Sequence, residues 1–181
     1  MPEHEIVDVE AIPLAAPVEE PFGYAQAWVH TRETTLVRIE ADDGTVGWGE
    51  CWGPVAGTRE TVEALLAPEL LGSDPRRAEA LSDGLYDLTR AAYQSIVPLP
   101  ALSGVDIALW DLKGRLLDLP VATLLGGRRR DRVRAYATGH YFKHGASLEE
   151  QYERIAAEAS ENADALGAVK AKIGLQLLGY G

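Results

Sequence analysis

Cysteine and long apolar runs are scarce in this 181-residue sequence. The single cysteine, Cys51, excludes a disulfide within the chain, which suits a reducing compartment. No run approaches the roughly 18 apolar residues that a membrane-spanning helix needs. The N-terminal stretch MPEHEIVDVE also lacks the basic start and the apolar segment of a signal peptide. These absences predict a cytoplasmic protein that does not enter a membrane.

Positive charge is also in short supply. The chain has 17 Lys and Arg against 28 Asp and Glu, which gives a formal net charge of −11. Such a surface repels phosphate backbones, which argues against nucleic-acid binding. An acidic surface that is poor in lysine is one way to stay soluble at high salt, so a salt-loving source is a hypothesis. The lysines are Lys113, Lys143, Lys170 and Lys172, and the last two fall within one three-residue window.

The first region of the chain has the pattern of an α+β domain. Residues 6–12 and 34–40 alternate as strands do, and Asp43-Gly44 followed by TVGWGE is a strong hairpin signal. Residues 13–28 are rich in Pro, Gly and aromatic side chains without a clear period, so we interpret them as a loop. Helical spacing of apolar residues then dominates up to residue 117. We therefore expect a three-stranded antiparallel sheet plus a helical bundle over residues 1–127.

The pattern changes over residues 128–181. The string VRAYATG is typical of a strand, SLEEQYERIAAEASENADALG of an amphipathic helix, and AVKAKIG of a second strand. Ser147 and Glu150 have the spacing of a capping box at the start of the helix. A strand, a helix and a strand in this order predict a β-α-β unit with parallel strands.

Lys170 and Lys172 are the residues that point most directly to chemistry. At alternate positions of one strand their side chains share a face, while Val169, Ala171 and Ile173 share the other. Two ammonium groups on the interior face of a parallel sheet would repel each other and lose hydration, and both effects favour the neutral amine. A neutral lysine can abstract a proton near neutral pH. A solvent-facing pair on an edge strand is the alternative that the strand alone leaves open.

Two motifs carry a resemblance to a known family. Residues 101–127, ALSGVDIALWDLKGRLLDLPVATLLGG, contain Ala-x-Ser-Gly-Val-Asp and then Ala-Leu-Trp-Asp-x-x-Gly. This pattern resembles the signature helix of the mandelate racemase/muconate lactonizing enzyme family of the enolase superfamily. The string AVKAKIG resembles the Lys-x-Lys motif at the end of that family's second barrel strand. The hairpin ending in GWGE is similar to part of the family's N-terminal capping domain, so the resemblance covers essentially the whole chain.

The resemblance implies roles for particular residues. Lys172 would be the acid/base on one face of the substrate, and Lys170 would lie near the substrate carboxylate. Two loops would cap the active site and choose the substrate. The expected substrate contacts are Phe22 and Tyr24 in loop 17–28, Trp52 in loop 51–57, and His140 after the first barrel strand. Simple packing of the aromatic loop residues is the alternative, and a supporting role or plain exposure is the alternative for His140.

The resemblance also implies a reaction and a metal ion. Members remove the proton beside a carboxylate and stabilise the resulting enediolate on Mg²⁺, as racemases, epimerases, cycloisomerases or sugar-acid dehydratases. The metal ligands are expected on barrel strands beyond Gly181. A complete barrel takes about 250 residues, so residues 128–181 would form only the start of a truncated (β/α) barrel. We expect the 181-residue chain to be inactive alone, and the intact enzyme to act on a small carboxylate as a homo-oligomer.

Other residues invite a catalytic interpretation that we do not favour. Asp106, Trp110 and Asp111 lie on the signature helix, where structural roles are the more common. His4, His30 and His144 have no sequence context that indicates a metal, and Cys51 is interpreted as a buried, inert thiol. The rival to the enzyme hypothesis is a capping-domain remnant that acts as a binding or assembly module.

Overall fold

The computed structural model describes residues 3–24, 27–53, 56–93 and 98–172, and the chain forms two compact units. The first unit contains residues 1–15 and 33–129, and the second contains residues 16–32 and 130–181. The second unit thus combines two separate stretches of the chain. Residues 16–32, which the sequence pattern assigned to the first domain, belong to the second unit because their side chains pack there.

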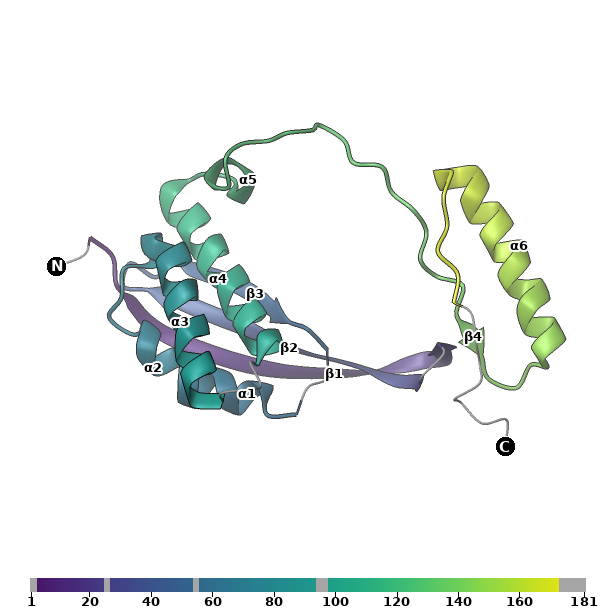
Figure 1. Ribbon diagram of the computed structural model, residues 1–181, viewed down its shortest axis with the longest axis horizontal. Coiled ribbons are helices and arrows are strands. Elements are labelled where there is room, and N and C mark those ends of the chain that lie inside the picture. Colours follow the sequence, from purple (N-terminus) through teal and green to yellow (C-terminus); the bar gives the residue numbers. More distant parts are fainter. Residues whose placement is uncertain (1–2, 25–26, 54–55, 94–97, 173–181) are drawn as a thin grey trace. The chain divides into compact units, whose positions relative to one another are not determined.

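A four-stranded sheet runs through the chain in the order β3-β2-β1-β4. Its strands are β1 (Ile6–Tyr24), β2 (Ala27–Ala41), β3 (Val46–Cys51) and the short β4 (Phe142–Lys143) (Figure 1). Strands β2 and β3 are antiparallel. The predicted turn between them is confirmed, because Gly44 has a φ of 84° and Ala41 donates its N–H to the Thr45 carbonyl over 2.9 Å.

Two expectations about this sheet are wrong. Residues 13–28 were expected to form a loop, but β1 continues to Tyr24 and β2 begins at Ala27. Backbone hydrogen bonding along a hairpin does not require alternating side chains, so a strand can form where the sequence shows no period. The sheet also has four strands rather than three, because β4 pairs antiparallel with β1, with Phe22 opposite Lys143 and Gly23 opposite Phe142.

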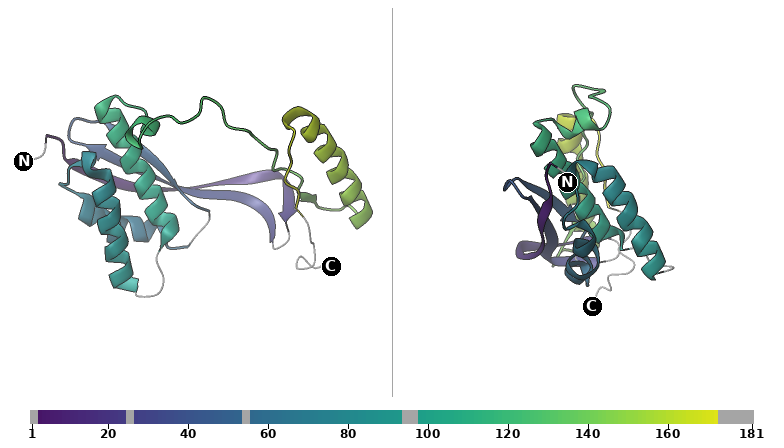
Figure 2. Two further views of the ribbon diagram at one scale, coloured as in Figure 1. Left: turned by 45° about the horizontal axis from the view of Figure 1, so that its top comes forward. Right: turned by 90° about the vertical axis from the view of Figure 1, so that its left-hand side faces the viewer.

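Helices cover one face of the sheet in the first unit (Figures 1 and 2). They are α1 (Thr58–Thr61), a π-helical turn (Val62–Leu66), α2 (Ala67–Leu70), a 3-10 turn (Pro75–Arg77), α3 (Ala78–Tyr93), α4 (Leu99–Leu117) and α5 (Val121–Leu124). Asp74 caps the 3-10 turn by accepting a hydrogen bond from the Arg76 N–H over 3.0 Å.

The core of the first unit is the contact between α4 and the sheet. The predicted apolar face of α4 is confirmed, since Val105, Ala108, Leu109 and Leu112 are all fully buried. Strand β3 approaches this helix through glycine. A Cβ atom on Gly49 would lie 1.9 Å from the carbonyl oxygen of Gly104 and one on Gly47 2.3 Å from that of Ala108, so neither position has room for a side chain.

The second unit contains helix α6 (Leu148–Leu166) and an isolated parallel bridge. The predicted capping box of Ser147 and Glu150 is present at the start of α6. Ala137 pairs parallel with Val169, so the predicted direction of pairing is confirmed. The expected strands on either side are otherwise not formed in the described residues, and the end of the second, from Ile173 onward, lies outside them.

Among the described residues, every helix falls short of the length and apolarity that crossing a bilayer requires.

Candidate active site

The lysine pair lies on the segment that follows α6. The backbone is fixed by two hydrogen bonds, from the Ala137 N–H to the Ala168 carbonyl over 3.1 Å and from the Lys170 N–H to the Ala137 carbonyl over 2.8 Å. Val169 forms the parallel bridge with Ala137, and the two lysines follow it in the chain. The Nζ of Lys170 lies 3.4 Å from the Tyr136 hydroxyl and 5.2 Å from the centre of its ring. Lys170 is exposed and Lys172 is half-buried.

Lys172 belongs to a continuous stack of rings and cations. Its Nζ lies 5.2 Å from the centre of the Tyr141 ring. That ring contacts Phe22 with centroids 4.5 Å apart and planes tilted by 52°. Arg32 lies on β2, and its guanidinium carbon is 4.6 Å from the centre of the Phe22 ring on β1. The structure therefore brings Lys172 and the predicted contact Phe22 into one cluster, joined by Tyr141.

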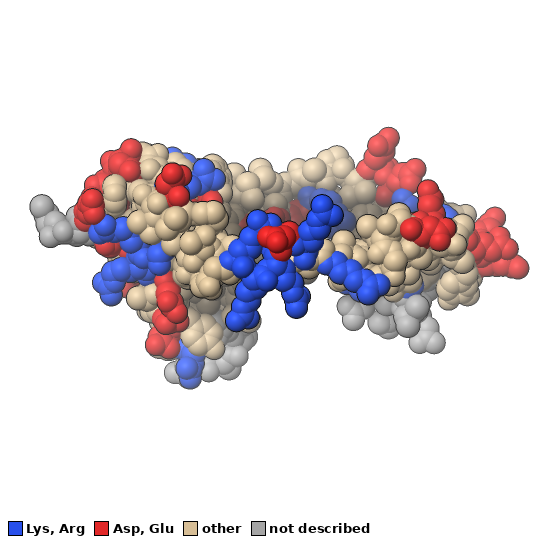
Figure 3. All heavy atoms as spheres, turned by 90° about the horizontal axis from the view of Figure 1, so that it is seen from above, with Lys and Arg blue, Asp and Glu red and all other residues tan. Residues whose placement is uncertain are grey.

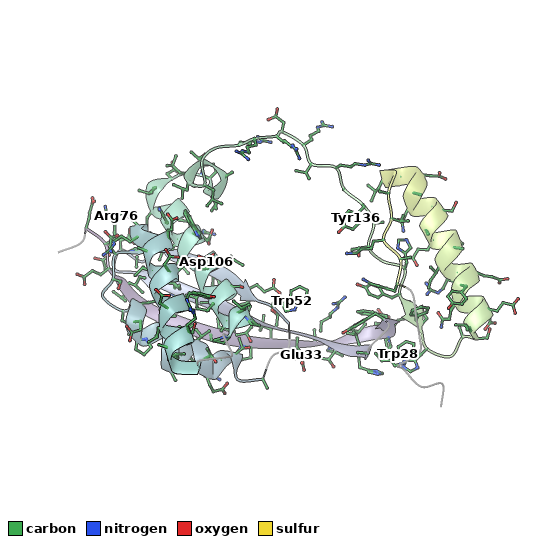
Figure 4. All side chains as sticks on the ribbon, viewed as in Figure 1. Trp28, Glu33, Trp52, Arg76, Asp106 and Tyr136 are labelled. Carbon is green, nitrogen blue, oxygen red and sulfur yellow. The ribbon has the colours of Figure 1, made fainter. Side chains whose placement is uncertain are left out.

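The hairpin end that carries Phe22 is held by β4. Pairing of Phe22 with Lys143 fixes the backbone, and the Nζ of Lys143 donates to the Glu20 carboxylate over 2.8 Å. The hydrogen bond from Lys143, together with its positive charge, holds the pKa of Glu20 below its ordinary value. Trp28 stacks on His144 with ring centres 3.9 Å apart. Figure 4 shows Trp28 beside β4 and Tyr136 on the segment that precedes it.

His140 lies at the centre of the second unit and is only 1% exposed. Its Nδ1 is 3.2 Å from the Lys170 carbonyl, and its Nε2 is 3.3 Å from the side-chain nitrogen of Asn162 on α6. The backbone N–H of His140 donates to the Glu158 carboxylate over 3.1 Å, and the backbone φ of His140 is 62°. Both ring nitrogens have partners within the protein, so this placement favours the supporting role over direct substrate contact. His140 joins the segment that carries the lysines to α6.

The other predicted contacts are not part of the stack. Tyr24 is half-buried at the end of β1, and Trp52, which directly follows β3, is 81% exposed. Near Trp52 the first unit has an open hollow of about 380 Å³. It is lined by Pro13, Leu14, Ala15, Glu33, Thr34, Thr35, Gly53 and Ala56. The predicted loop 51–57 therefore borders a hollow, although its residues 54–55 lie outside the described part of the chain.

Structural contacts account for the three prominent residues of the signature helix, Asp106, Trp110 and Asp111, as we expected. Ser82 on α3 donates to Asp106 over 2.5 Å, which ties α3 to α4. Asp111 accepts from the Trp48 N–H over 2.9 Å, which ties α4 to β3. The Nζ of Lys113 lies 4.7 Å from the centre of the Trp110 ring. Figure 4 places Asp106 on the helical layer of the first unit.

Metal-ligating side chains do not gather around the lysines in the described residues. The one group of three that the described residues contain, His4, Asp42 and Asp43, belongs to the first unit, where His4 is within ion-pair distance of both carboxylates. Close to the lysines lie tyrosine rings and a backbone carbonyl, which do not form an oxygen ligand set suited to Mg²⁺. Among the described residues, no group of three such ligands lies beside the lysines.

Positive and negative charges are segregated between residues 128–134 and helix α6. Five arginines fall within residues 128–134, and Lys and Arg side chains gather along this segment in Figure 3. Helix α6 instead carries many carboxylates, of which Glu149, Glu150, Glu153, Glu161 and Asp164 are exposed. Positive charge is thus concentrated in one segment, residues 128–134, of a chain whose net charge is −11.

Sequence reasoning missed three residues of the cluster, Arg32, Tyr136 and Tyr141. Tyr136 shares a face with Lys170 because Ala137 pairs parallel with Val169. The register itself could not be obtained from the sequence. Arg32 and Tyr141 had no signal, since they meet through Phe22 across more than 100 residues of chain.

Comparisons with known proteins agree with the family resemblance. The family model described as mandelate racemase / muconate lactonizing enzyme, N-terminal domain, matches residues 6–126. The D-galactarolactone cycloisomerase of Agrobacterium fabrum (strain C58 / ATCC 33970) is 42% identical over 161 residues, covering 87% of this chain and 41% of that protein. The arabinonate dehydratase of Saccharolobus solfataricus is 38% identical over 122 residues, covering 66% of this chain and 32% of that protein.

Solved structures give the same result. The 3,6-anhydro-D-galactonate cycloisomerase from Zobellia galactanivorans matches with a TM-score of 0.74 and 34% identity, covering 94% of this chain and 43% of that one. The chain spans less than half the length of each of these relatives. The family model nevertheless covers well over half of this chain, and the signature motif lies on helix α4. This chain belongs to the mandelate racemase/muconate lactonizing enzyme family of the enolase superfamily.

Proposed function

We propose that this chain supplies the capping domain and the lysine base of an enzyme that removes the proton beside the carboxylate of a sugar acid. The observation that carries the proposal is the placement of Lys170 and Lys172 on tyrosine rings of one segment, residues 136–141. The similar proteins of known function are a cycloisomerase and dehydratases whose names refer to sugar acids and their lactones. Cycloisomerisation and dehydration can both start with removal of the acidic proton on the carbon beside the carboxylate.

In this proposal Lys172 takes the proton and Lys170 faces the substrate carboxylate. The half-buried Lys172 lies against Tyr141, with its Nζ 5.2 Å from the centre of that ring. Tyr141 and Phe22 form an apolar wall that excludes water from one side of the amine. In the proposed step the Nζ of Lys172 accepts the α-proton, and the electron pair of the broken C–H bond stays on the substrate.

Magnesium is part of the proposal but not of the steps assigned to these residues. When bound, it would neutralise the negative charge that develops on the carboxylate oxygens. The described residues around the lysines do not fit the ion, so we assign its ligands to residues after Gly181.

A chimera tests the proposal. Residues 1–172 of this chain are joined to the remaining barrel of the Agrobacterium fabrum cycloisomerase, to which this chain is 42% identical over 161 residues. Exchange of the substrate α-proton with solvent deuterium is measured by NMR on D-galactarolactone with Mg²⁺. Lys172→Ala should lower exchange by about 10²–10⁴-fold, the range for a general base. Lys113→Ala is the matched control, because Lys113 also lies on an aromatic ring but in the first unit, and it should leave exchange unchanged.

Exchange that survives in Lys172→Ala would place the base elsewhere and refute the proposal. The second candidate function, a binding or assembly module, is favoured by the lack of a magnesium ligand set among the described residues. A chimera that folds and binds substrate but shows no exchange, while the intact cycloisomerase does, would support this second function.

A further inference from the structure

Polar side chains on one face of α6 hydrogen-bond the segment formed by residues 140–143. They are spaced three or four residues apart, which places them on one side of the helix: Gln151, Arg154, Glu158 and Asn162. The first three bind backbone groups of residues 143, 141 and 140 respectively. The fourth lies 3.3 Å from the Nε2 of His140. The segment is therefore held by side chains of α6 as well as by its pairing with β1.

The His140 ring continues the hydrogen bonding of the strand that carries the lysines. The parallel bridge ends with the bond from the Lys170 N–H to the Ala137 carbonyl. In a regular parallel ladder the Gly139 N–H would bond the Lys170 carbonyl next. In the described residues the Nδ1 of His140 takes this place, 3.2 Å from the carbonyl oxygen. The backbone leaves the ladder here because His140 has a φ of 62°, a left-handed conformation in which histidine is enriched.

The two neighbours of the ring decide which nitrogen carries the proton. A carbonyl oxygen only accepts, so the Nδ1 of His140 must donate to Lys170. The Nε2 faces the side-chain nitrogen of Asn162, which donates, so the Nε2 must accept. His140 is only 1% exposed, so water does not compete for either nitrogen. The geometry thus places the ring proton on Nδ1.

The position of this ring bears on Lys172, the base of the proposed function. Lys172 follows the bonded Lys170 carbonyl by two residues, and its Nζ lies 5.2 Å from the centre of the Tyr141 ring. Tyr141 directly follows His140, and Arg154 donates to its carbonyl. One turn of the chain therefore fixes both the strand that carries the amine and the ring against which the amine lies.

We propose that His140 is a positioning residue for Lys172 and acts by donating its Nδ1–H to the Lys170 carbonyl. This inference rests on the proposed function for the role of Lys172, but the place of the proton on His140 does not depend on that role. Loss of the donor would free the Lys170 carbonyl and let the residues after it shift. A displacement of about 1 Å at a catalytic group can cost about 10²-fold in rate. His140 acts through the backbone, without touching the substrate.

The first test locates the proton by NMR of the ¹⁵N-labelled 181-residue chain. A protonated and an unprotonated ring nitrogen differ widely in ¹⁵N chemical shift, so long-range ¹H–¹⁵N correlations of the ring identify the tautomer. The proton of His140 should be on Nδ1, with Nε2 bare. A proton on Nε2, alone or together with one on Nδ1, would overturn the inference.

The second test uses the chimera and compares two substitutions that both suit a left-handed backbone. Asparagine keeps an N–H donor at the δ position, whereas glycine has none. His140→Gly should lower kcat for exchange of the substrate α-proton by about 10²-fold and leave KM within about twofold. His140→Asn should keep kcat within about threefold of the unchanged chimera, because its donor can still reach the carbonyl. A fall in kcat at constant KM locates the fault in the chemical step rather than in substrate binding.

The matched control is Thr89→Ala. Thr89 is also fully buried and donates to a backbone carbonyl, that of Tyr86 over 2.8 Å, but it lies on α3 in the first unit. This variant should leave kcat unchanged. Equal values of kcat in His140→Gly and His140→Asn, or a fall of the same size in Thr89→Ala, would contradict the positioning role. If His140→Gly does not fold, a loss of about 10²-fold in His140→Asn has the same meaning.

The results separate this inference from the proposed function. If exchange survives Lys172→Ala, the base assignment fails, while the NMR assignment of the His140 proton stands on its own. If Lys172→Ala abolishes exchange but His140→Gly exchanges as fast as the unchanged chimera, the base assignment stands and the positioning role of His140 fails.

Discussion

Replacement of Gly49 by alanine should separate α4 from β3 in the first unit. The added Cβ would lie 1.9 Å from the Gly104 carbonyl oxygen and 2.8 Å from the Ala108 nitrogen. Both neighbours are backbone atoms of α4, so no side chain can rotate out of the way. Either the helix or the strand must move, and the fully buried side chains of Val105 and Leu109 beside the contact would lose their packing.

The expected loss of stability is large for a single methyl group. Overpacking a core costs typically about 1–3 kcal/mol. Because the obstruction here is backbone, we expect at least about 3 kcal/mol, which is a considerable share of the about 5–15 kcal/mol that stabilises a typical domain. The same reasoning gives Gly84→Ala the opposite sign. Gly84 lies within α3 with nothing within 4 Å of an added Cβ, so helix propensity alone should stabilise the protein by about 0.5–1 kcal/mol.

The assay is urea unfolding followed by tryptophan fluorescence and by far-UV circular dichroism. Trp48 and Trp110 report on the first unit, where Trp48 lies on β3 and Trp110 on α4. The midpoint should fall strongly in Gly49→Ala and rise slightly in Gly84→Ala. A Gly49→Ala midpoint equal to that of the unchanged chain would refute the close approach of β3 and α4, and with it the reason for glycine in the GWGE string.

Two further predictions concern the first unit. Burial raises the pKa of the Cys51 thiol to about 11 from an ordinary 9.0, so the folded state keeps its proton where the unfolded state loses it. This contribution to stability is complete below pH 9, is lost progressively between pH 9 and 11, and amounts to about 2–3 kcal/mol. Urea titrations over this pH range should show a smaller loss of unfolding free energy in Cys51→Ala than in the unchanged chain. An equal loss in both proteins would refute the prediction. Asp106→Ala should cost about 1–2 kcal/mol because Ser82 loses a 2.5 Å hydrogen bond to a carboxylate. A double-mutant cycle with Ser82→Ala should show coupling, and strict additivity of the two costs would contradict the contact.

The local elements of this protein could be predicted because each has a signal within a few residues. The turn at Gly44, the cap at Asp74, the capping box of Ser147 and the buried face of α4 all follow from side chains near them in the sequence. The hairpin arm could not be predicted in this way. Residues 13–24 lack a period-two pattern, yet they form a strand because their backbone finds hydrogen-bonding partners.

In the candidate site, too, some features follow from local sequence and others only from tertiary contacts. The sequence by itself determined the family, the two lysines at alternate positions and the direction of the pairing beneath them, because motifs and periodicity are local properties. The tertiary structure decided that His140 is buried rather than exposed, and that Arg32, Phe22, Tyr141 and Lys172 form one stack. Contacts between segments more than 100 residues apart depend on strand register and on the packing of α6, and neither is encoded in any short stretch of the chain.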